Sequence, residues 1–371
     1  MAKTSYVPSG AKIKVVGCGG GGCNAITRMV REGIRGVEFI AMNTDAQHLE
    51  ITEAATRIHL GEHLTRGLGA GGDHLIGQKA AEESREEVKQ AITGADMVFV
   101  TAGMGGGTGT GSVPMVAQIA KQSGALTIAV VTKPFAFEGA HRSQVAEEGI
   151  KNLIDKVDTL IIIPNERLFE LCDPKTGVDG AFQMADEVLS HGVQAIAEVV
   201  TVPGLVNLDF ADVRTVMKDA GPAWMSMGRG AGPNRAIDAA KEALASPLLD
   251  VSVDEAKGVL FNIAGGSNFT LFEVNGAADI IRQHVDPEAN VIFGVVLDSN
   301  MGNEVRLTLI ATGFSADYAL VENSMKRELQ NMIKAGKKSE AELAIPTFMR
   351  QRRVLPGQRV HHPVGSSSQS R

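Results

Sequence analysis

The stretch Gly103–Gly111 reads Gly-Met-Gly-Gly-Gly-Thr-Gly-Thr-Gly, and it says more about the fold than any other part of the sequence. Six of the nine residues are glycine, so backbone N–H groups can surround an anion without interference from side chains. An apolar run over 97–102 precedes it and predicts a buried parallel strand, and a helix is expected over 113–122. The stretch predicts a phosphate-binding loop, although it lacks the Gly-Lys-Ser/Thr ending of a P-loop.

A second glycine-rich segment, residues 17–25, lies between an expected strand over 12–16 and an expected helix. Gly17, Gly19 and Gly22 match the G-x-G-x-x-G fingerprint of dinucleotide-binding proteins. Taken alone, this match is weak evidence for an oxidoreductase with a nicotinamide or flavin cofactor.

A third glycine-rich segment, residues 67–72, favours a different ligand. A dehydrogenase needs one pyrophosphate turn, whereas three glycine loops, each expected at a strand-to-helix junction, favour a longer phosphate chain held from several sides. Asp45, after an expected strand over 37–42, stands where a ribose-binding acid is expected. A side chain at Gly107 or Gly109 would fill the space of the phosphate, so substitution there is expected to abolish binding and spare the fold.

Four motifs make the chain resemble the FtsZ family of tubulin-like proteins: residues 19–22, Asn43-Thr44-Asp45, Gly103–Gly111 and residues 207–212. The resemblance covers about residues 11–313 and a short C-terminal peptide. It implies an α/β, tubulin-like fold with a doubly wound, mostly parallel GTP-binding sheet, a long central helix and a smaller α+β C-terminal domain. It also implies a GTPase that polymerises head to tail into the bacterial cell-division ring.

The resemblance and the composition together predict the division of the chain. The expected parts are an N-terminal extension (1–10), a GTP-binding domain (11–177), a central helix (178–204), a GTPase-activating domain (205–314), a linker (315–342), a partner-binding peptide (343–353) and a disordered tail (354–371). Within the C-terminal domain, β-branched alternation predicts strands over 257–264, 290–297 and 304–311, and a helix over about 275–284.

The family also implies which residues hold the nucleotide. Glu138 and Arg142 would contact ribose and phosphates, Phe182 would stack on the base, and Asn165 and Asp186 would bond the guanine edge. A carboxylate suits guanine because it accepts from both the ring N–H and the exocyclic amino group. The full expected set is Gly19, Gly20, Gly21, Gly22, Cys23, Asn24, Asp45, Gly69, Ala70, Gly71, Gly103, Gly106, Gly107, Thr108, Gly109, Thr132, Pro134, Glu138, Arg142, Asn165, Phe182 and Asp186.

Hydrolysis needs a water oriented for in-line attack, and the glycine loops contain no base for this step. The family assigns the step to Asn207, Asp209 and Asp212, which follow the expected central helix. That helix would be roughly 35 Å long at about 1.5 Å per residue, so these side chains could reach only the nucleotide of the next subunit. The sequence alone also allows Asp209 and Asp212 to be residues that start a helix.

Composition limits the remaining possibilities. The net charge is −7, and the body of the chain is acidic, which argues against a nucleic-acid-binding protein. No stretch is long enough to span a membrane, and a cytoplasmic protein is expected. Cys18, Cys23 and Cys172 have no metal-ligand spacing and are interpreted as reduced, the first two beside the nucleotide. No metal bound by the protein is expected; Mg²⁺ would be held mainly through the nucleotide.

The segment Leu343–Arg353 resembles the family's C-terminal peptide, which docks on membrane-tethering and regulatory division proteins. It has an Ile-Pro core, an aromatic residue and a basic end, as short linear motifs do. Ala344 stands where the family commonly has Asp, and a featureless disordered tail is the competing interpretation. For the whole chain, the alternatives are a dinucleotide-dependent oxidoreductase and a filament protein of the same fold that does not hydrolyse GTP.

Overall fold

The computed structural model describes residues 10–171, 175–201, 209–249, 253–298 and 301–314. The expected partner-binding peptide and its linker lie outside the described residues, as do Asn207 and Cys172. The described elements all belong to one compact unit that ends at Phe314.

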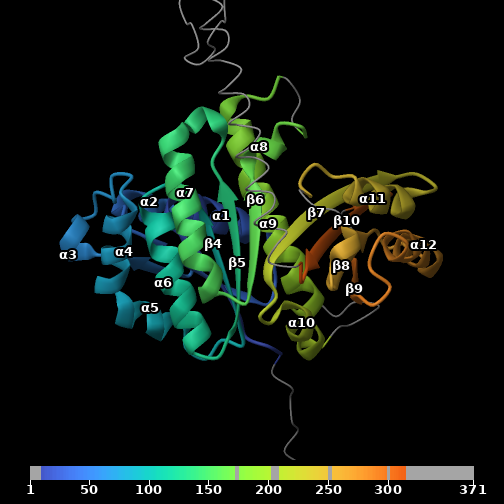
Figure 1. Ribbon diagram of the computed structural model, residues 1–371, viewed down its shortest axis with the longest axis horizontal. Helices are drawn as coiled ribbons and strands as arrows, with labels where there is room; N and C mark the ends of the chain where they lie inside the picture. The colour runs from blue at the N-terminus through green and yellow to red at the C-terminus, as the bar shows by residue number, and fades with distance from the viewer. Residues whose placement is uncertain (1–9, 172–174, 202–208, 250–252, 299–300, 315–371) are drawn as a thin grey trace, which may run out of the picture. The chain divides into compact units, whose positions relative to one another are not determined.

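Six parallel strands form the first part of the sheet (Figure 1). They are β1 (Ile13–Cys18), β2 (Val37–Asn43), β3 (Thr56–His59), β4 (Met97–Gly103), β5 (Leu126–Lys133) and β6 (Thr159–Pro164). Their spatial order is β3-β2-β1-β4-β5-β6, so the chain reverses its direction of winding between β1 and β4. In doubly wound sheets, the crevice at the carboxyl ends of the two strands that flank such a reversal is where ligands bind.

Helices cover both faces of these strands. They are α1 (Gly19–Glu32), α2 (Ala46–Ile51), α3 (Glu62–Thr65), α4 (His74–Glu83), α5 (Arg85–Ile92), α6 (Thr108–Gln122), α7 (Ala140–Leu153), α8 (Asn165–Leu168) and α9 (Val178–Thr201), with short 3-10 turns at Ala136–Glu138 and Ile154–Lys156. Residues of α4, α5, α6 and α7 form one core with the sheet, and residues of α1 and α9 form the other. Successive side chains of β1 alternate between them: Val15 belongs to the second core and Val16 to the first.

The long central helix, α9, confirms the expected connector. Val193 and Ile196 of α9 are buried in the same core as Val130 of β5. Leu260 and Ile310, from the C-terminal strands, belong to that core as well. The helix is thus apolar on the sides that face both parts of the protein, which explains its nearly continuous apolar pattern.

The C-terminal part adds a mixed sheet and three helices. Its elements are α10 (Phe210–Met217), β7 (Gly221–Ala231), α11 (Arg235–Leu244), a 3-10 turn (Val253–Glu255), β8 (Gly258–Gly265), α12 (Leu271–Arg282), β9 (Asn290–Leu297) and β10 (Glu304–Thr312). Strand β7 pairs in parallel with β6 and antiparallel with β10, so all ten described strands form one sheet. The tubulin-like α/β fold class is confirmed.

Three expectations about local structure are wrong. Helix α6 begins at Thr108 and not at 113, because the last glycines of the phosphate-loop motif form its first turn. Helix α12 begins at Leu271 and not near 275, since Thr270 and Glu273 form a capping box. The third glycine-rich segment does not follow a strand: it connects the short helix α3 to α4.

Candidate functional site

A cavity of about 420 Å³ lies at the carboxyl ends of the central parallel strands, where the winding reverses. Residues from α1, from the β4–α6 turn, from the ends of β5 and β6, and from the start of α9 line it. They are Gly20, Gly21, Asn24, Gly103, Met104, Gly106, Gly107, Thr108, Gly109, Thr132, Pro134, Glu138, Arg142, Asn165, Phe182, Ala185, Asp186 and Leu189. Most of the nucleotide-binding residues expected from sequence are therefore brought together in one place.

One end of the cavity is walled by backbone. A side chain added at Gly106 would meet no atom within 4 Å, so this turn is open toward the cavity. The Thr110 Oγ1 accepts a hydrogen bond from Gly105 N (2.8 Å) and holds the turn in place. The hydroxyl of Thr108 lies 2.6 Å from that of Thr44, in the loop after β2. Because α6 begins at Thr108, its N-terminal dipole also acts here, and the whole arrangement suits an anion.

The other end is aromatic and polar. The Phe182 ring packs edge-on against the buried Phe135 ring, with centroids 5.5 Å apart, and 40% of Phe182 is exposed. The Oδ1 atom of Asn165 is buried and has no hydrogen-bond partner among the described residues. Burial raises the pKa of Asp186 to about 7, and the nearby Arg28 guanidinium opposes this shift. An unsatisfied acceptor and a desolvated carboxyl group, beside an exposed ring face, suit a planar ligand with hydrogen-bond donors on its edge.

An ion pair also lines the cavity. Arg142 Nη1 donates to Glu138 Oε2 at 2.6 Å, and the Arg142 side chain is largely exposed. The other carboxylate oxygen of Glu138 accepts from Phe135 N at 2.9 Å. Glu138 therefore fixes both Arg142 and the loop that carries the supporting Phe135 ring.

Some expected binding residues do not line the cavity, because they hold the loops together. A side chain on Gly19 would come within 2.7 Å of Gly109 N, and one on Gly22 within 2.6 Å of Thr101 O, so these glycines allow α1 to pack closely on its neighbours. Cys23 is fully buried against Ala41 and Leu49.

The two described cysteines correct a further expectation. Cys18 and Cys23 are free, as predicted, but both thiols are buried in the core and not beside the cavity. Burial raises the pKa of Cys18 to about 12 and that of Cys23 to about 11, so both are protonated and poorly reactive.

Asp45 and the third glycine-rich segment likewise do not line the cavity. The Asp45 carboxylate caps α2 by accepting from His48 N at 3.0 Å. Gly69 N donates to Thr44 O, and Ala70 packs against Gly107, where an added Cβ would lie 2.8 Å from the Ala70 Cβ. Gly71 is in the same loop and lines no part of the cavity. Gly69 and Ala70 thus position the Thr44 and Gly107 backbone.

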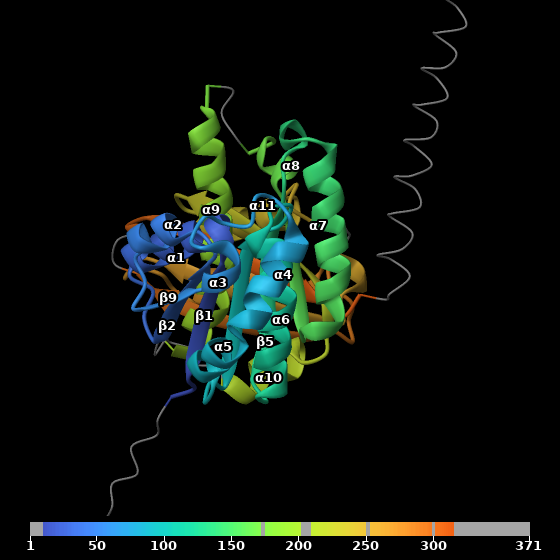
Figure 2. The ribbon, with the colours of Figure 1, turned by 90° about the vertical axis from the view of Figure 1, so that its left-hand side faces the viewer.

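The expected catalytic carboxylates lie elsewhere. Asp209 and Asp212 are exposed at the start of α10. Both ribbon views place α10 at the end of α9 opposite the helix start that carries Phe182 (Figures 1 and 2). Asp209 occupies the N-cap position of α10, yet its side chain makes no capping hydrogen bond. The structure therefore gives no support to a purely helix-capping role for Asp209.

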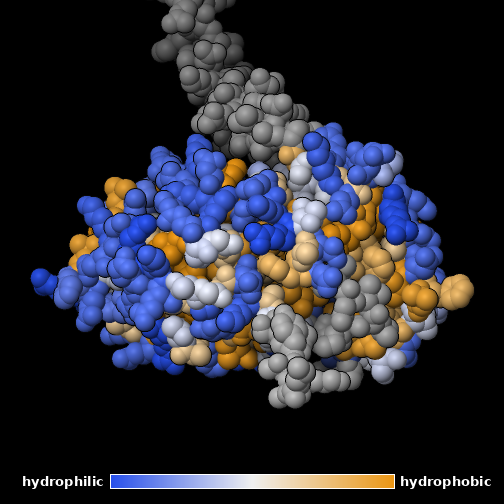
Figure 3. Space-filling model, turned by 90° about the horizontal axis from the view of Figure 1, so that it is seen from below, coloured by the Kyte–Doolittle hydropathy of each residue, from blue (hydrophilic) through white to orange (hydrophobic). Residues whose placement is uncertain are grey.

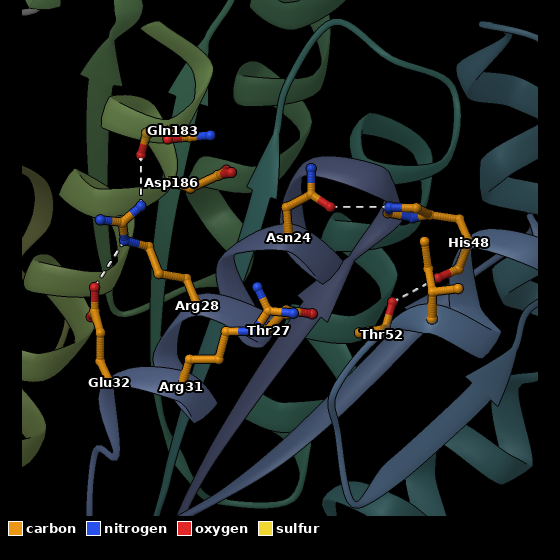
Figure 4. A pocket seen from close by; sticks show the side chains of 10 residues that line it. Asn24, Thr27, Arg28, Arg31, Glu32, His48, Thr52, Gln183 and Asp186 are labelled. Atoms are coloured by element: carbon orange, nitrogen blue, oxygen red, sulfur yellow. Dashed lines mark hydrogen bonds and ion pairs between the residues drawn. The ribbon is translucent and has the colours of Figure 1, made fainter. Parts of the chain in front are cut away.

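Sequence reasoning did not find every residue that forms the site. Met104, Ala185 and Leu189 complete the cavity wall, and the last two are separated by four positions on α9, a spacing that could have indicated them. A second depression of about 570 Å³ adjoins the cavity and shares Asn24 and Asp186 with it (Figure 4). Arg28 crosses its edge and donates to Gln183 O and to Glu187, which ties α1 to α9.

The described residues offer no ready-made metal site. No three of their His, Cys, Asp or Glu side chains are grouped so that they could hold a metal ion. Among the helices of the described part, none is long and apolar enough to cross a bilayer.

Known proteins share this arrangement of strands and loops. Residues 12–173 match the GTPase domain of the Tubulin/FtsZ family, which places the chain among the tubulin-type GTPases that bind GTP and GDP. Residues 221–315 match the FtsZ family C-terminal domain. An FtsZ dimer from M. jannaschii is similar at 50% identity and a TM-score of 0.80, over 82% of this chain and 89% of that one. The chain belongs to the FtsZ family.

More distant structures share the fold. CetZ2 from Haloferax volcanii, solved as a GTPγS-bound protofilament, is 20% identical with a TM-score of 0.71, over 88% of this chain and 99% of that one. CetZ1 from the same organism, a GDP-bound monomer, is 19% identical with a TM-score of 0.71, over 82% of this chain and 95% of that one. Nothing in the comparisons supports a dinucleotide-dependent oxidoreductase.

Proposed function

We propose that this GTPase polymerises head to tail into filaments and that each active site is completed by the next subunit. The observation that carries the proposal is the separation between two groups of residues. The cavity residues Phe182 and Asp186 are near the start of α9, whereas the exposed Asp209 and Asp212 begin α10, which lies at the opposite end of α9 (Figure 1). Among the described residues that line the cavity, only Glu138 and Asp186 carry carboxyl groups.

Within the cavity, each group has a proposed task. Phe182 stacks on guanine, and ionised Asp186 accepts from the guanine ring N–H and amino group. The glycine turn at 105–107 and the Thr108 hydroxyl bind the phosphates. Asp209 and Asp212 of the next subunit, with Asn207, then orient the attacking water, a positioning task that phosphoryl transfer requires.

Exposed apolar side chains at both ends of the molecule support a head-to-tail contact. Leu68 (85% exposed) lies on the segment between α3 and α4, and Phe137 (56%) lies on the 3-10 turn next to the cavity residue Glu138. On the end that carries α10, hydrophobic side chains gather on the C-terminal half (Figure 3). Two different complementary surfaces on one chain make a heterologous contact, which extends into a filament. The similar FtsZ of M. jannaschii has been solved as a dimer.

In the cell, we propose that these filaments form the division ring on the cytoplasmic side of the membrane. Residues 343–353 would bind tethering and regulatory proteins, as the resemblance of this peptide to the family's partner-binding motif suggests.

GTP-dependent sedimentation with phosphate release measured in parallel tests this proposal. The purified chain should pellet with GTP and not with GDP, and release phosphate as it does so. A chain that ends at residue 342 should behave identically in this assay yet leave its filaments unattached to membrane in cells. Sedimentation that is independent of nucleotide, or hydrolysis without any assembly, would contradict the proposal.

A further inference from the structure

A row of hydrogen bonds runs from the end of β2, across α2, to the rim of the cavity. Asp45 N donates to Asn43 Oδ1 at 3.3 Å. The Nδ2 atom of Asn43 lies 3.1 Å from His48 Nδ1, and His48 Nε2 lies 3.0 Å from Asn24 Oδ1. Figure 4 shows His48 and Asn24 facing each other across the adjoining depression, joined by the last of these bonds.

The direction of every bond in this row is fixed by its first member. A backbone N–H can only donate, so Asn43 must present its carbonyl oxygen to Asp45 and its NH₂ group to His48. Asn43 is 2% exposed, so its amide cannot turn toward water instead. Because an amide NH₂ also only donates, His48 Nδ1 must accept. The neutral imidazole then carries its proton on Nε2 and donates it to Asn24.

Main-chain hydrogen bonds and packing against the glycine loop hold His48 in this position. His48 N donates to Asp45 Oδ1 at 3.0 Å, and Thr52 Oγ1 donates to His48 O at 2.8 Å. On its other side, the ring lies over Gly20 of the glycine loop, where an added Cβ would be 3.8 Å from the His48 Cε1. The ring is therefore packed between the first turn of α2 and the wall of the cavity.

We propose that His48 is a positioning residue that fixes the Asn24 amide as a hydrogen-bond donor toward the nucleotide. With its Oδ1 held by His48, Asn24 turns its NH₂ group away from His48, as Figure 4 shows. This inference rests on the proposed nucleotide-binding role of the cavity that Asn24 lines.

The assigned orientation is complementary to the rest of the base-binding end. Asn165 offers a buried oxygen that has no hydrogen-bond partner in the described part of the chain, and ionised Asp186 offers two more acceptors. Asn24 adds a donor beside them. The bound nucleoside must then place N–H groups against Asn165 and Asp186 and an acceptor atom, a ring nitrogen or a ribose oxygen, against Asn24. Without His48, the Asn24 amide could rotate and present either group.

The tautomer of His48 can be read directly by ¹⁵N NMR on the wild-type chain without nucleotide. The neutral form of the ring should carry its proton on Nε2 and have a non-protonated, hydrogen-bonded Nδ1. A proton on Nδ1 would reverse the row and overturn the proposal. Because no nucleotide is present, this result is independent of the function proposed above.

Nucleotide affinity supplies the second test, with GDP as the probe so that hydrolysis does not interfere. His48→Phe removes both nitrogens and should weaken binding about three- to tenfold, the effect of one hydrogen bond. In an Asn24→Ala background the same change should have no further effect. His48→Gln, which can still accept from Asn43 and donate to Asn24, should restore part of the affinity.

Ile51→Ala is the matched control, because Ile51 belongs to the same helix and depression but is 74% exposed. It should leave affinity unchanged. Equal losses from His48→Phe with and without Asn24 would show that His48 acts by some other route and would overturn the proposal. Failure of the wild-type chain to bind GDP would refute the proposed function and leave the NMR result standing.

Discussion

At the residue scale, the role proposed for Asp186 makes its protonation state decide how well the cavity can hold guanine. Its carboxyl group is largely removed from water, and this burial raises its pKa to about 7. Only the ionised form can accept two hydrogen bonds from a guanine edge. Nucleotide binding must therefore be coupled to release of a proton whenever the pH is below about 7.

We expect GDP affinity to be level above pH 7 and to fall as the pH decreases, approaching tenfold per pH unit. The stability of the fold without nucleotide has the opposite pH dependence. A carboxyl group whose pKa is raised by folding stabilises the protein at low pH, and this stabilisation is lost as the pH rises through about 7. Calorimetric titrations with GDP between pH 5.5 and 8.5 test the first expectation, and thermal unfolding over the same range tests the second.

Asp186→Asn is the control, because the phosphates of GDP titrate in the same range. The variant should bind weakly at every pH, and the ratio of wild-type to variant affinity should carry the dependence assigned to Asp186. A ratio that stays constant from pH 5.5 to 8.5 would contradict the assignment. Arg28→Gln should move the midpoint to higher pH, since the guanidinium charge holds the pKa of Asp186 down.

Single residues were predictable from sequence where a motif requires one chemistry. Asn165, Phe182 and Asp186 could be placed at the cavity by resemblance, and the structure brings them together there. The sequence could not show that Gly22 and Cys23 face the protein interior, because a glycine motif does not show which glycines face a ligand and which face another strand. His48 gave no signal, since a lone His on a short helix has no pattern.

At the scale of elements, the glycines of the phosphate-loop motif separate into two groups. Gly111 lies in α6, and a Cβ there would be 2.1 Å from His74 O of α4. Gly77 of α4 is equally close to the motif, since a Cβ there would be 2.2 Å from Gly107 O. These glycines let α4 and α6 pack backbone to backbone. Gly106, in contrast, borders only open space.

We therefore expect Gly111→Ala and Gly106→Val to have opposite effects. Gly111→Ala should lower the free energy of unfolding by about 1–3 kcal/mol, because α4 must move away from α6. Gly106→Val should leave stability unchanged and lower GDP affinity strongly, because its side chain enters the anion-binding end of the cavity. Thermal unfolding and GDP titration of both variants decide the matter. A Gly111→Ala variant as stable as the wild type, or normal GDP affinity in Gly106→Val, would show that the assignment of these two glycines to packing and to binding is wrong.

This contrast corrects the expectation that substitution at Gly107 or Gly109 would spare the fold. An added Cβ would meet Ala70 and Asp73 at Gly107, and the Gly103 and Cys18 carbonyls at Gly109, so a change there disturbs packing as well as binding. The sequence predicted most of the strands and α9, since apolar periodicity reports burial directly, but it did not predict β3 or β7. It placed the start of α6 too late, because glycines and threonines resemble a loop when they form the first turn of a packed helix.

At the scale of the whole molecule, the proposed active site is divided between two ends of one chain. In this proposal an isolated subunit holds GTP in the cavity, while its own Asp209 and Asp212 lie exposed at α10, beyond the far end of α9. No local motif could reveal this division, because it depends on the length and direction of α9. It predicts that hydrolysis depends on contact between subunits.

Asp212→Asn should bind GDP normally and hydrolyse GTP about 10²-fold or more slowly, because a water-positioning carboxylate is lost. Mixed with wild type, it should enter the same filaments and lower phosphate release per wild-type subunit, since some wild-type nucleotides then face a defective neighbour. Wild-type specific activity should rise steeply above a threshold protein concentration. Asp238→Asn, which changes an exposed acid on α11, is the matched control and should change neither quantity. Constant specific activity on dilution, together with simple additivity in the mixtures, would place the complete active site within one chain and return Asp209 and Asp212 to the role of helix-start residues.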